Sequence, residues 1–143
     1  MTQPTKPVTD SCHCFALRRA ARRISNHYDA MLAPSGLRIS QFSLLALIRQ
    51  YGAPTINTLA ELMDLDRTTT GKNLRPLERE GLVRIVRPES DRRARAAELT
   101  EAGKTRLAEA GALWRQAQVS YEALNGAGPI AEVEAQLAGF SMP

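Results

Sequence analysis

The stretch that decides the fold is residues 57–99, which read NTLAELMDLDRTTTGKNLRPLEREGLVRIVRPESDRRARAAEL. Its first half carries apolar residues at helical spacing, which predicts two short helices, over residues 57–64 and 67–80. Asp66 stands directly before the second helix, where its carboxylate can accept from a backbone N–H, and Gly81 stands just past its end. This half therefore predicts two helices joined by a tight turn.

The second half of the stretch has the alternating apolar period of a strand. Residues 82–87 are rich in β-branched side chains, and residues 96–99 can return beside them after the turn at residues 88–91. Two short helices followed by a two-stranded hairpin form a winged helix-turn-helix. We expect this motif to extend over residues 37–99.

Helical periodicity continues on both sides of the motif, so the predicted fold class is mainly α with a small β-wing. We expect one compact domain overall. Residues 14–36 and 100–143 supply dimerisation helices that flank the winged helix-turn-helix, and residues 1–13 form a flexible N-terminal arm. Beyond the two short helices, helices are predicted over residues 14–32, 41–51, 101–124 and 130–140, with a break at residues 125–129. Of these, residues 41–51 lie within the motif and the others flank it.

Two apolar seams on the C-terminal helices predict a homodimer. Such heptad-like spacing requires a partner helix, and a small monomer would otherwise expose a large apolar surface. The seams consist of Leu107, Trp114, Tyr121 and Leu124, and of Ile130, Val133, Leu137 and Phe140.

Charge and composition limit the class of protein. The chain has 143 residues, 43% of them hydrophobic, and a net charge of +4. Residues 66–95 hold nine basic and five acidic residues, and this clustered positive charge indicates a polyanion partner. No apolar run is long enough to span a membrane, and residues 1–11 lack the apolar segment of a secretory signal. We therefore expect a cytoplasmic protein with no membrane partner.

The basic segment predicts an interface with double-stranded DNA. The second short helix suits the major groove, where Asn73 can read adenine and Lys72 or Arg75 can read guanine or bind phosphate. The hairpin from Arg84 to Arg95 holds five arginines, and a narrow minor groove attracts inserted arginine. The candidate contacts on the helix are Arg67, Thr68, Thr69, Thr70, Lys72, Asn73 and Arg75.

The chain resembles the MarR family of bacterial regulators. The resemblance implies an obligate dimer, joined through its first and last helices, that binds a pseudo-palindromic operator. It also implies that Arg93 enters the minor groove at the wing tip, next to Arg92, while Asp91 braces the wing arginines. The motifs that carry it are LAEL (59–62), DRTTT (66–70), LEREGLV (77–83), DRRAR (91–95) and LTEAG (99–103).

A second resemblance concerns the signal that the protein senses. Cys14, followed fourteen residues later by Tyr28, is similar to the start of the organic-hydroperoxide-sensing branch, where a cysteine is oxidised and a tyrosine helps to hold it. A helix N-terminus favours the thiolate, and Cys12 could act as the resolving thiol for the partner subunit. The branch's other two pocket tyrosines fall at Arg18 and Ile39, so this chain departs from its pattern.

Other interpretations stay open. Cys14 is alternatively an inert thiol, and a small molecule between the dimer helices and the winged helix could serve as the effector. A thiol peroxidase and a non-specific architectural DNA-binding protein are the alternative classes. Because residues adjacent on a helix point about 100° apart, Cys12, His13 and Cys14 cannot all ligate one ion. We predict a regulator, acting as a repressor, with no catalytic residue, metal or cofactor.

Overall fold

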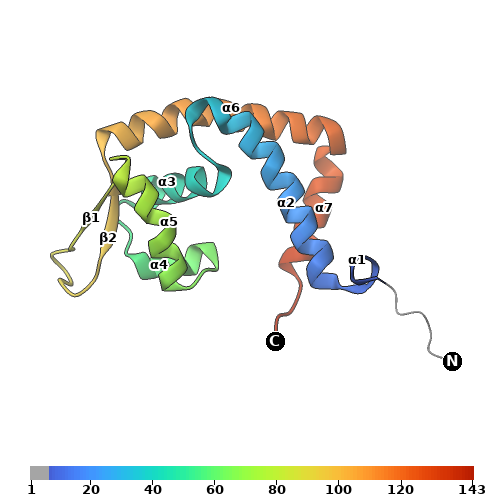
Figure 1. Ribbon diagram of the computed structural model, residues 1–143, viewed down its shortest axis with the longest axis horizontal. Helices are drawn as coiled ribbons and strands as arrows, with labels where there is room; N and C mark the ends of the chain where they lie inside the picture. The colour runs from blue at the N-terminus through green and yellow to red at the C-terminus, as the bar shows by residue number, and fades with distance from the viewer. Residues whose placement is uncertain (1–6) are drawn as a thin grey trace.

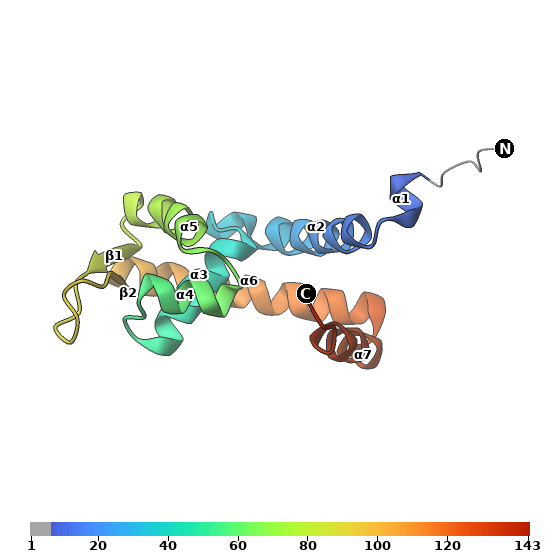
Figure 2. The ribbon, with the colours of Figure 1, turned by 90° about the horizontal axis from the view of Figure 1, so that it is seen from below.

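The computed structural model describes residues 7–143 and has two parts, a winged helix at one end and a helical arm at the other (Figure 1). The long helix α6 runs along the top of both parts and connects them. Seen from below, α2 and α7 lie on either side of α6 (Figure 2). The helices are α1 (Val8–Ser11), α2 (His13–Leu32), α3 (Ile39–Tyr51), α4 (Ile56–Met63), α5 (Arg67–Arg79), α6 (Glu101–Asn125) and α7 (Ala127–Ala138), and the strands are β1 (Val83–Val86) and β2 (Ala96–Leu99).

Helix α5 has the two ends that its sequence predicts. Asp66 adopts an extended conformation and its Oδ1 accepts from the Thr69 backbone N–H at 2.7 Å. Beyond the last turn, Gly81 takes a left-handed φ of 72° and the Leu82 N–H returns to the Leu77 carbonyl at 2.9 Å. This hydrogen bond turns the chain directly from α5 into β1.

The wing is an antiparallel pair that also contacts the first helix of the motif. Val83 pairs with Leu99 and Val86 with Ala96, so β1 and β2 are in register along their whole length. Thr55, just before α4, forms a bridge with Ala96. The end of β2 next to the wing loop is therefore attached to the helix-turn-helix.

The core lies around α3, as its nearly all-round apolar sequence predicts. Leu44, Leu45 and Ile48 are almost completely buried, and α3 contacts α4, α5, α6 and β2. This packing fixes the position of α5 and of the wing relative to α6.

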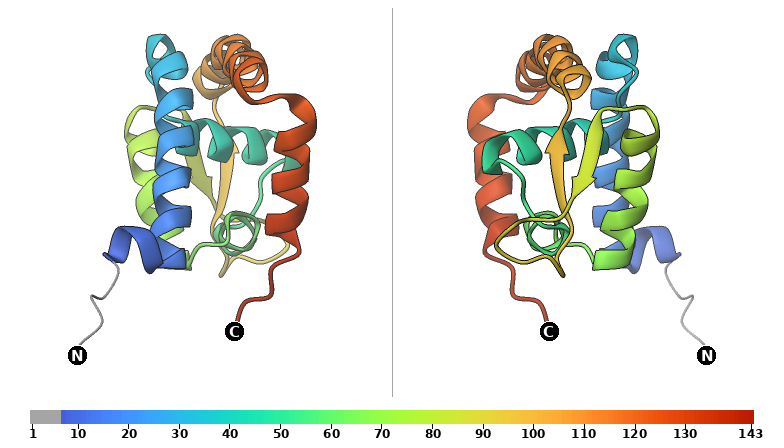
Figure 3. Two further views of the ribbon diagram at one scale, coloured as in Figure 1. Left: turned by 90° about the vertical axis from the view of Figure 1, so that its right-hand side faces the viewer. Right: turned by 90° about the vertical axis from the view of Figure 1, so that its left-hand side faces the viewer.

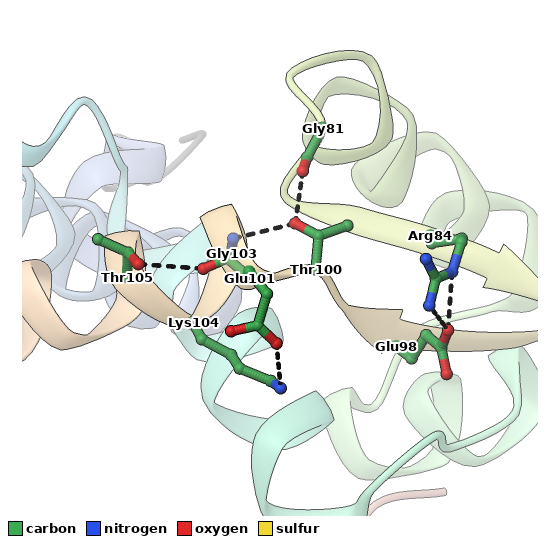
Figure 4. Close-up of polar contacts among 8 residues, drawn as sticks. All are labelled: Gly81, Arg84, Glu98, Thr100, Glu101, Gly103, Lys104 and Thr105. Atoms are coloured by element: carbon green, nitrogen blue, oxygen red, sulfur yellow. Dashed lines mark hydrogen bonds and ion pairs between the residues drawn. The ribbon is translucent and has the colours of Figure 1, made fainter.

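Hydrogen bonds and a close approach of backbones join the wing to α6 (Figure 4). The Thr100 hydroxyl donates to the Gly81 carbonyl and accepts from the Gly103 N–H at 3.1 Å, while the Thr100 N–H donates to the Leu82 carbonyl at 3.1 Å. Helix α6 passes so close to Leu82 that a methyl group on Gly103 would overlap the Leu82 carbonyl oxygen. Glycine at position 103 is thus a packing requirement.

The first half of the seam on α6 is covered by the protein's own chain, contrary to expectation. Leu107 is only 4% exposed, and Trp114 stacks on Phe42 of α3 with ring centroids 5.7 Å apart. The partner helix that the spacing requires is here α3, because apolar periodicity does not distinguish a partner within the chain from one in another subunit. In the second half of the seam, Tyr121 lies against Tyr28 of α2 with ring centroids 6.4 Å apart, and Leu124 is 74% exposed.

The N-terminal arm and the C-terminal break also differ from expectation. Residues 8–11 of the predicted flexible arm form the short helix α1, and residues 1–6 lie outside the described residues. The break is confined to Gly126, whose φ of 82° turns the chain away from the axis of α6, so that α7 begins at Ala127 and ends before Phe140. Pro129 fits within the first turn of α7, where a missing N–H costs nothing.

An apolar groove lies between α2 and α7, at the end of the molecule away from the wing. Figure 3 shows these two helices standing apart below α6. The groove has a volume of about 560 Å³, and Leu17, Ile24, Ile130, Val133 and Leu137 line it. Val133 and Leu137 are half exposed, so this end presents the apolar surface that a dimer would cover.

Within residues 7–143 no single helix has the length and apolar character to cross a membrane. The segments 13–35 and 39–51 together are long and apolar enough to span a membrane, by length and composition only, but the two are bent by 72° relative to each other.

Candidate nucleic-acid interface

The N-terminal half of α5 presents its polar residues to solvent. Arg67, Thr68, Lys72 and Arg75 are exposed and Asn73 is half-buried. The start of α5, helix α4 and the wing tip lie on the side of the molecule opposite α6 (Figures 1 and 3). Thr69 is likewise half-buried, so six of the seven sequence-predicted helix residues retain exposed surface.

Thr70 was predicted as a DNA contact, and the structure shows that this is wrong. Its side chain is 0% exposed and its hydroxyl donates to the Asp66 carbonyl at 2.9 Å. Thr70 lies on the inner face of α5, one turn before Leu74 and two before Leu77, which are also buried. That spacing was the signal in the sequence that identifies Thr70 as a core residue.

Thr69 stabilises the N-terminal end of α5. Its hydroxyl donates to Asp66 Oδ2 at 2.7 Å in addition to the backbone N–H that reaches Oδ1. These two hydrogen bonds from Thr69 lower the pKa of Asp66. The cap is therefore ionised at neutral pH, and its contribution to stability is lost only as the pH falls below the ordinary range of an aspartate.

The wing tip is held by Asp91, through the backbone. Asp91 Oδ1 accepts from the Arg93 N–H at 3.0 Å and the Asp91 carbonyl accepts from the Ala94 N–H at 3.1 Å. The resemblance implied that Asp91 braces the wing arginines, but no ion pair between Asp91 and a guanidinium group occurs within residues 7–143. The Arg92 and Arg93 side chains are exposed, as their predicted role requires.

One wing arginine is neutralised within the chain. Arg84 forms an ion pair with Glu98 across the two strands (Figure 4). The other arginines of the hairpin form no ion pair within the described part of the chain. Their charge is therefore available to a partner.

The comparisons with known proteins agree with this geometry. Residues 37–94 match the MarR family. The chain is 36% identical to the transcriptional regulator MosR of M. tuberculosis, with a TM-score of 0.75 over 92% of this chain and 95% of that chain. The chain belongs to the MarR family.

Two MarR-type folds similar to this chain have been solved with DNA. The structure of MosR with DNA is 38% identical and has a TM-score of 0.79 over 90% of this chain and 92% of that chain. The repressor CouR, bound to a 23-mer DNA duplex, is 26% identical with a TM-score of 0.80 over 96% of this chain and 97% of that chain. CouR has also been solved with p-coumaroyl-CoA.

A curated relative is the organic hydroperoxide resistance transcriptional regulator of Bacillus subtilis (strain 168). It is 29% identical over 90 residues, which are 63% of this chain and 61% of the relative. The match thus spans less than two thirds of that regulator's length.

The cysteines of this MarR-family chain lie at the start of α2. Both are exposed and free, and Cys12 is the N-cap of α2, with its Sγ accepting from the Phe15 N–H at 3.4 Å. The capping role of Cys12 was missed by sequence reasoning, because cysteine is not a common capping residue. Within residues 7–143, no three His, Cys, Asp or Glu side chains gather where they could hold a metal ion.

Tyr28 lies far from Cys14 in the same chain. The two are fourteen residues apart on one helix, which corresponds to roughly 21 Å along its axis. Tyr28 is buried, and its hydroxyl donates to Gln118 of α6. Burial raises the pKa of Tyr28. Tyr28 cannot hold Cys14 within one subunit, so the predicted pairing requires a dimer.

A cavity of about 610 Å³ lies between α3 of the winged helix and α6. Phe42 and Trp114 form an aromatic wall, and Arg49 and Arg115 are exposed at its edge. Aromatic faces with nearby guanidinium groups suit a planar organic anion.

Proposed function

We propose that this protein is a homodimeric transcriptional regulator that binds a pseudo-palindromic operator and acts as a repressor. The observation that carries the proposal is the shared surface of α5 and the wing tip, in a chain whose MarR-family relatives are solved on DNA. In each subunit α5 enters the major groove and the wing enters the adjacent minor groove. We infer that the protein acts in the cytoplasm and is not an enzyme.

The proposed contacts follow from exposure. Arg67, Thr68, Lys72, Asn73 and Arg75 face the major groove. Arg92 and Arg93 reach the minor groove, and Asp91 positions them through the wing backbone. Footprinting on the DNA upstream of the protein's own gene tests the proposal, because many repressors bind there; protection of a site with two-fold symmetry is expected, and uniform weak protection would indicate an architectural protein.

We expect binding to depend strongly on salt. Three to five phosphate contacts per subunit release about six to ten counterions per dimer, which gives a slope of log K against log salt of about −5 to −9. Fluorescence anisotropy on the footprinted duplex between 50 and 300 mM salt, roughly the range in which such slopes are resolved, measures it. A slope shallower than about −2 would contradict docking by two winged helices.

We further propose that thiol oxidation releases the DNA. The support is the similarity to the Bacillus hydroperoxide regulator and the two exposed cysteines at the start of a dimerisation helix. The Cys14 thiolate attacks the O–O bond of an organic hydroperoxide, which yields a sulfenic acid and an alcohol. The partner's Cys12 thiol then displaces the hydroxyl as water and forms a disulfide between subunits. A shift of α2 changes the spacing of the two α5 helices, which must match one DNA turn of about 34 Å.

Single variants distinguish the roles of the two cysteines. We expect cumene hydroperoxide to release the wild-type protein from DNA, Cys14→Ser to stay bound, and Cys12→Ser to be released without an intersubunit disulfide. Gel shifts and non-reducing electrophoresis measure these outcomes. Because Cys12 accepts the Phe15 N–H, a reversed pattern would assign the first oxidation to Cys12 instead. Release of both variants like wild type would exclude a thiol switch, and repeated peroxide turnover with a thiol reductant would indicate an enzyme.

A small-molecule effector is the second candidate signal, favoured by the cavity between α3 and α6. Trp114 is the only tryptophan in the chain, so its fluorescence reports on this cavity alone. We expect a saturable change with an aromatic carboxylate such as cinnamate, and a weaker one in the Arg49→Gln variant. An unchanged spectrum with cinnamate and benzoate would speak against an aromatic acid here.

A further inference from the structure

We propose that the crevice between the wing, the start of α4 and the start of α5 is a phosphate-binding site. The crevice has a volume of about 280 Å³, and Arg67, Arg93, Arg95 and Asn57 line it, together with Asp91. These residues come from three separate segments, and two of them, Asn57 and Arg95, were not among the predicted contacts. The inference deepens the proposed function, because the experiment below that uses DNA rests on the protein binding an operator.

The crevice is held in shape by the backbone. The Ile56 N–H donates to the Arg95 carbonyl at 2.9 Å, and the Ala97 N–H donates to the Pro54 carbonyl at 2.9 Å. The bridge between Thr55 and Ala96 lies between these two hydrogen bonds. Strand β2 and the start of α4 therefore form one wall, which is present before any ligand binds.

The charges of the crevice favour an anion. Three arginines and a single aspartate line it, and Asp91 already accepts the Arg93 N–H. None of the three guanidinium groups forms an ion pair within residues 7–143. Like charges in one concavity repel each other, and the forked donors of arginine match the oxygens of a phosphate. A phosphate group would compensate this excess charge.

The start of α4 adds a backbone donor. Of the N–H groups in its first turn, that of Ile56 is bonded to Arg95, that of Thr58 to the Thr55 hydroxyl at 3.1 Å, and that of Leu59 to the Thr55 carbonyl at 3.0 Å. Asn57 carries the remaining one, and this residue lines the crevice. A helix N-terminus with such an N–H group complements the arginines in binding an anion.

The crevice lies between the element proposed for the major groove and the one proposed for the minor groove. The sugar-phosphate backbone that separates the two grooves passes between α5 and the wing, so the geometry points to one backbone phosphate per half-site as the occupant. This phosphate would lock the wing to α4 and α5. A free phosphate compound has the same chemistry, and the test below separates the two sources.

The first arm uses the free protein and inorganic phosphate. In two-dimensional NMR, the Asn57 amide and the Arg95 side-chain N–H are expected to shift saturably on titration at constant ionic strength. Arg95→Gln should weaken this binding by about tenfold, the loss of one charge-assisted contact. Arg87→Gln, which removes an exposed wing arginine outside the crevice, should leave it unchanged. No saturable shift, or an equal effect of both variants, would overturn the phosphate site.

The second arm uses the footprinted duplex with single phosphates replaced by neutral methylphosphonates. If the crevice holds a DNA phosphate, one position per half-site lowers the affinity of wild type, and Arg95→Gln loses nothing further at that position. Arg87→Gln should lose affinity additively there. Phosphate binding without such a position would assign the site to a free phosphate compound. Failure of wild type to bind any duplex would refute the proposed function, while the first arm would still decide the crevice.

Discussion

Gly103→Ala is expected to lower the free energy of unfolding by about 3 kcal/mol, the largest stability effect of any single substitution we foresee. The added methyl group would overlap the Leu82 carbonyl oxygen. That oxygen cannot move aside freely, because it accepts the Thr100 N–H at 3.1 Å and belongs to the turn between α5 and β1. Either this hydrogen bond or the packing of α6 must give way.

Urea denaturation followed by far-UV circular dichroism measures the effect, at one protein concentration because dimerisation couples to stability. Gly111→Ala is the matched control, since it lies in the same helix and its new methyl group would meet nothing closer than an arginine side-chain atom at 3.8 Å. Alanine there should raise stability by about 0.5–1 kcal/mol through helix propensity. Equal urea midpoints for Gly103→Ala and wild type would refute the packing argument.

Arg93→Ala is expected to weaken operator binding by at least about 30-fold, because each dimer loses two contacts of about 1 kcal/mol or more. The guanidinium group is exposed and forms no ion pair within residues 7–143. The hydrogen bond from position 93 to Asp91 is made by the backbone, so alanine retains it. The wing should therefore keep its shape, and the melting temperature should not change.

Lys104→Ala provides the control, because it removes one positive charge from α6, a helix on the side of the molecule opposite the wing tip (Figure 1). Its affinity for the operator should stay within about twofold of wild type, as for a screened, distant charge. Anisotropy titrations and thermal unfolding of both variants give the comparison. A drop in the melting temperature of Arg93→Ala would mean that Arg93 is structural and that the wing assignment is wrong.

The sequence by itself determined the fold class and most of the secondary structure, apart from helix α1 and the start of α7. Asp66 and Gly81 mark the ends of α5 because each residue type satisfies a local requirement, one an unpaired N–H and the other a positive φ. The change of apolar period marks the wing for the same reason, since each period reflects the geometry of a single element. Arg67, Lys72 and Arg75, which the sequence offered as DNA contacts, are exposed on α5.

Only the tertiary structure decided which residues meet. The α6 seam begins against α3 rather than a second subunit, and Tyr28 is held by α6, far from Cys14. The crevice of Arg67, Arg93 and Arg95 depends on backbone pairing between β2 and the start of α4, about 40 residues apart. Contacts of this range follow from how elements pack, and neither periodicity nor capping carries that information.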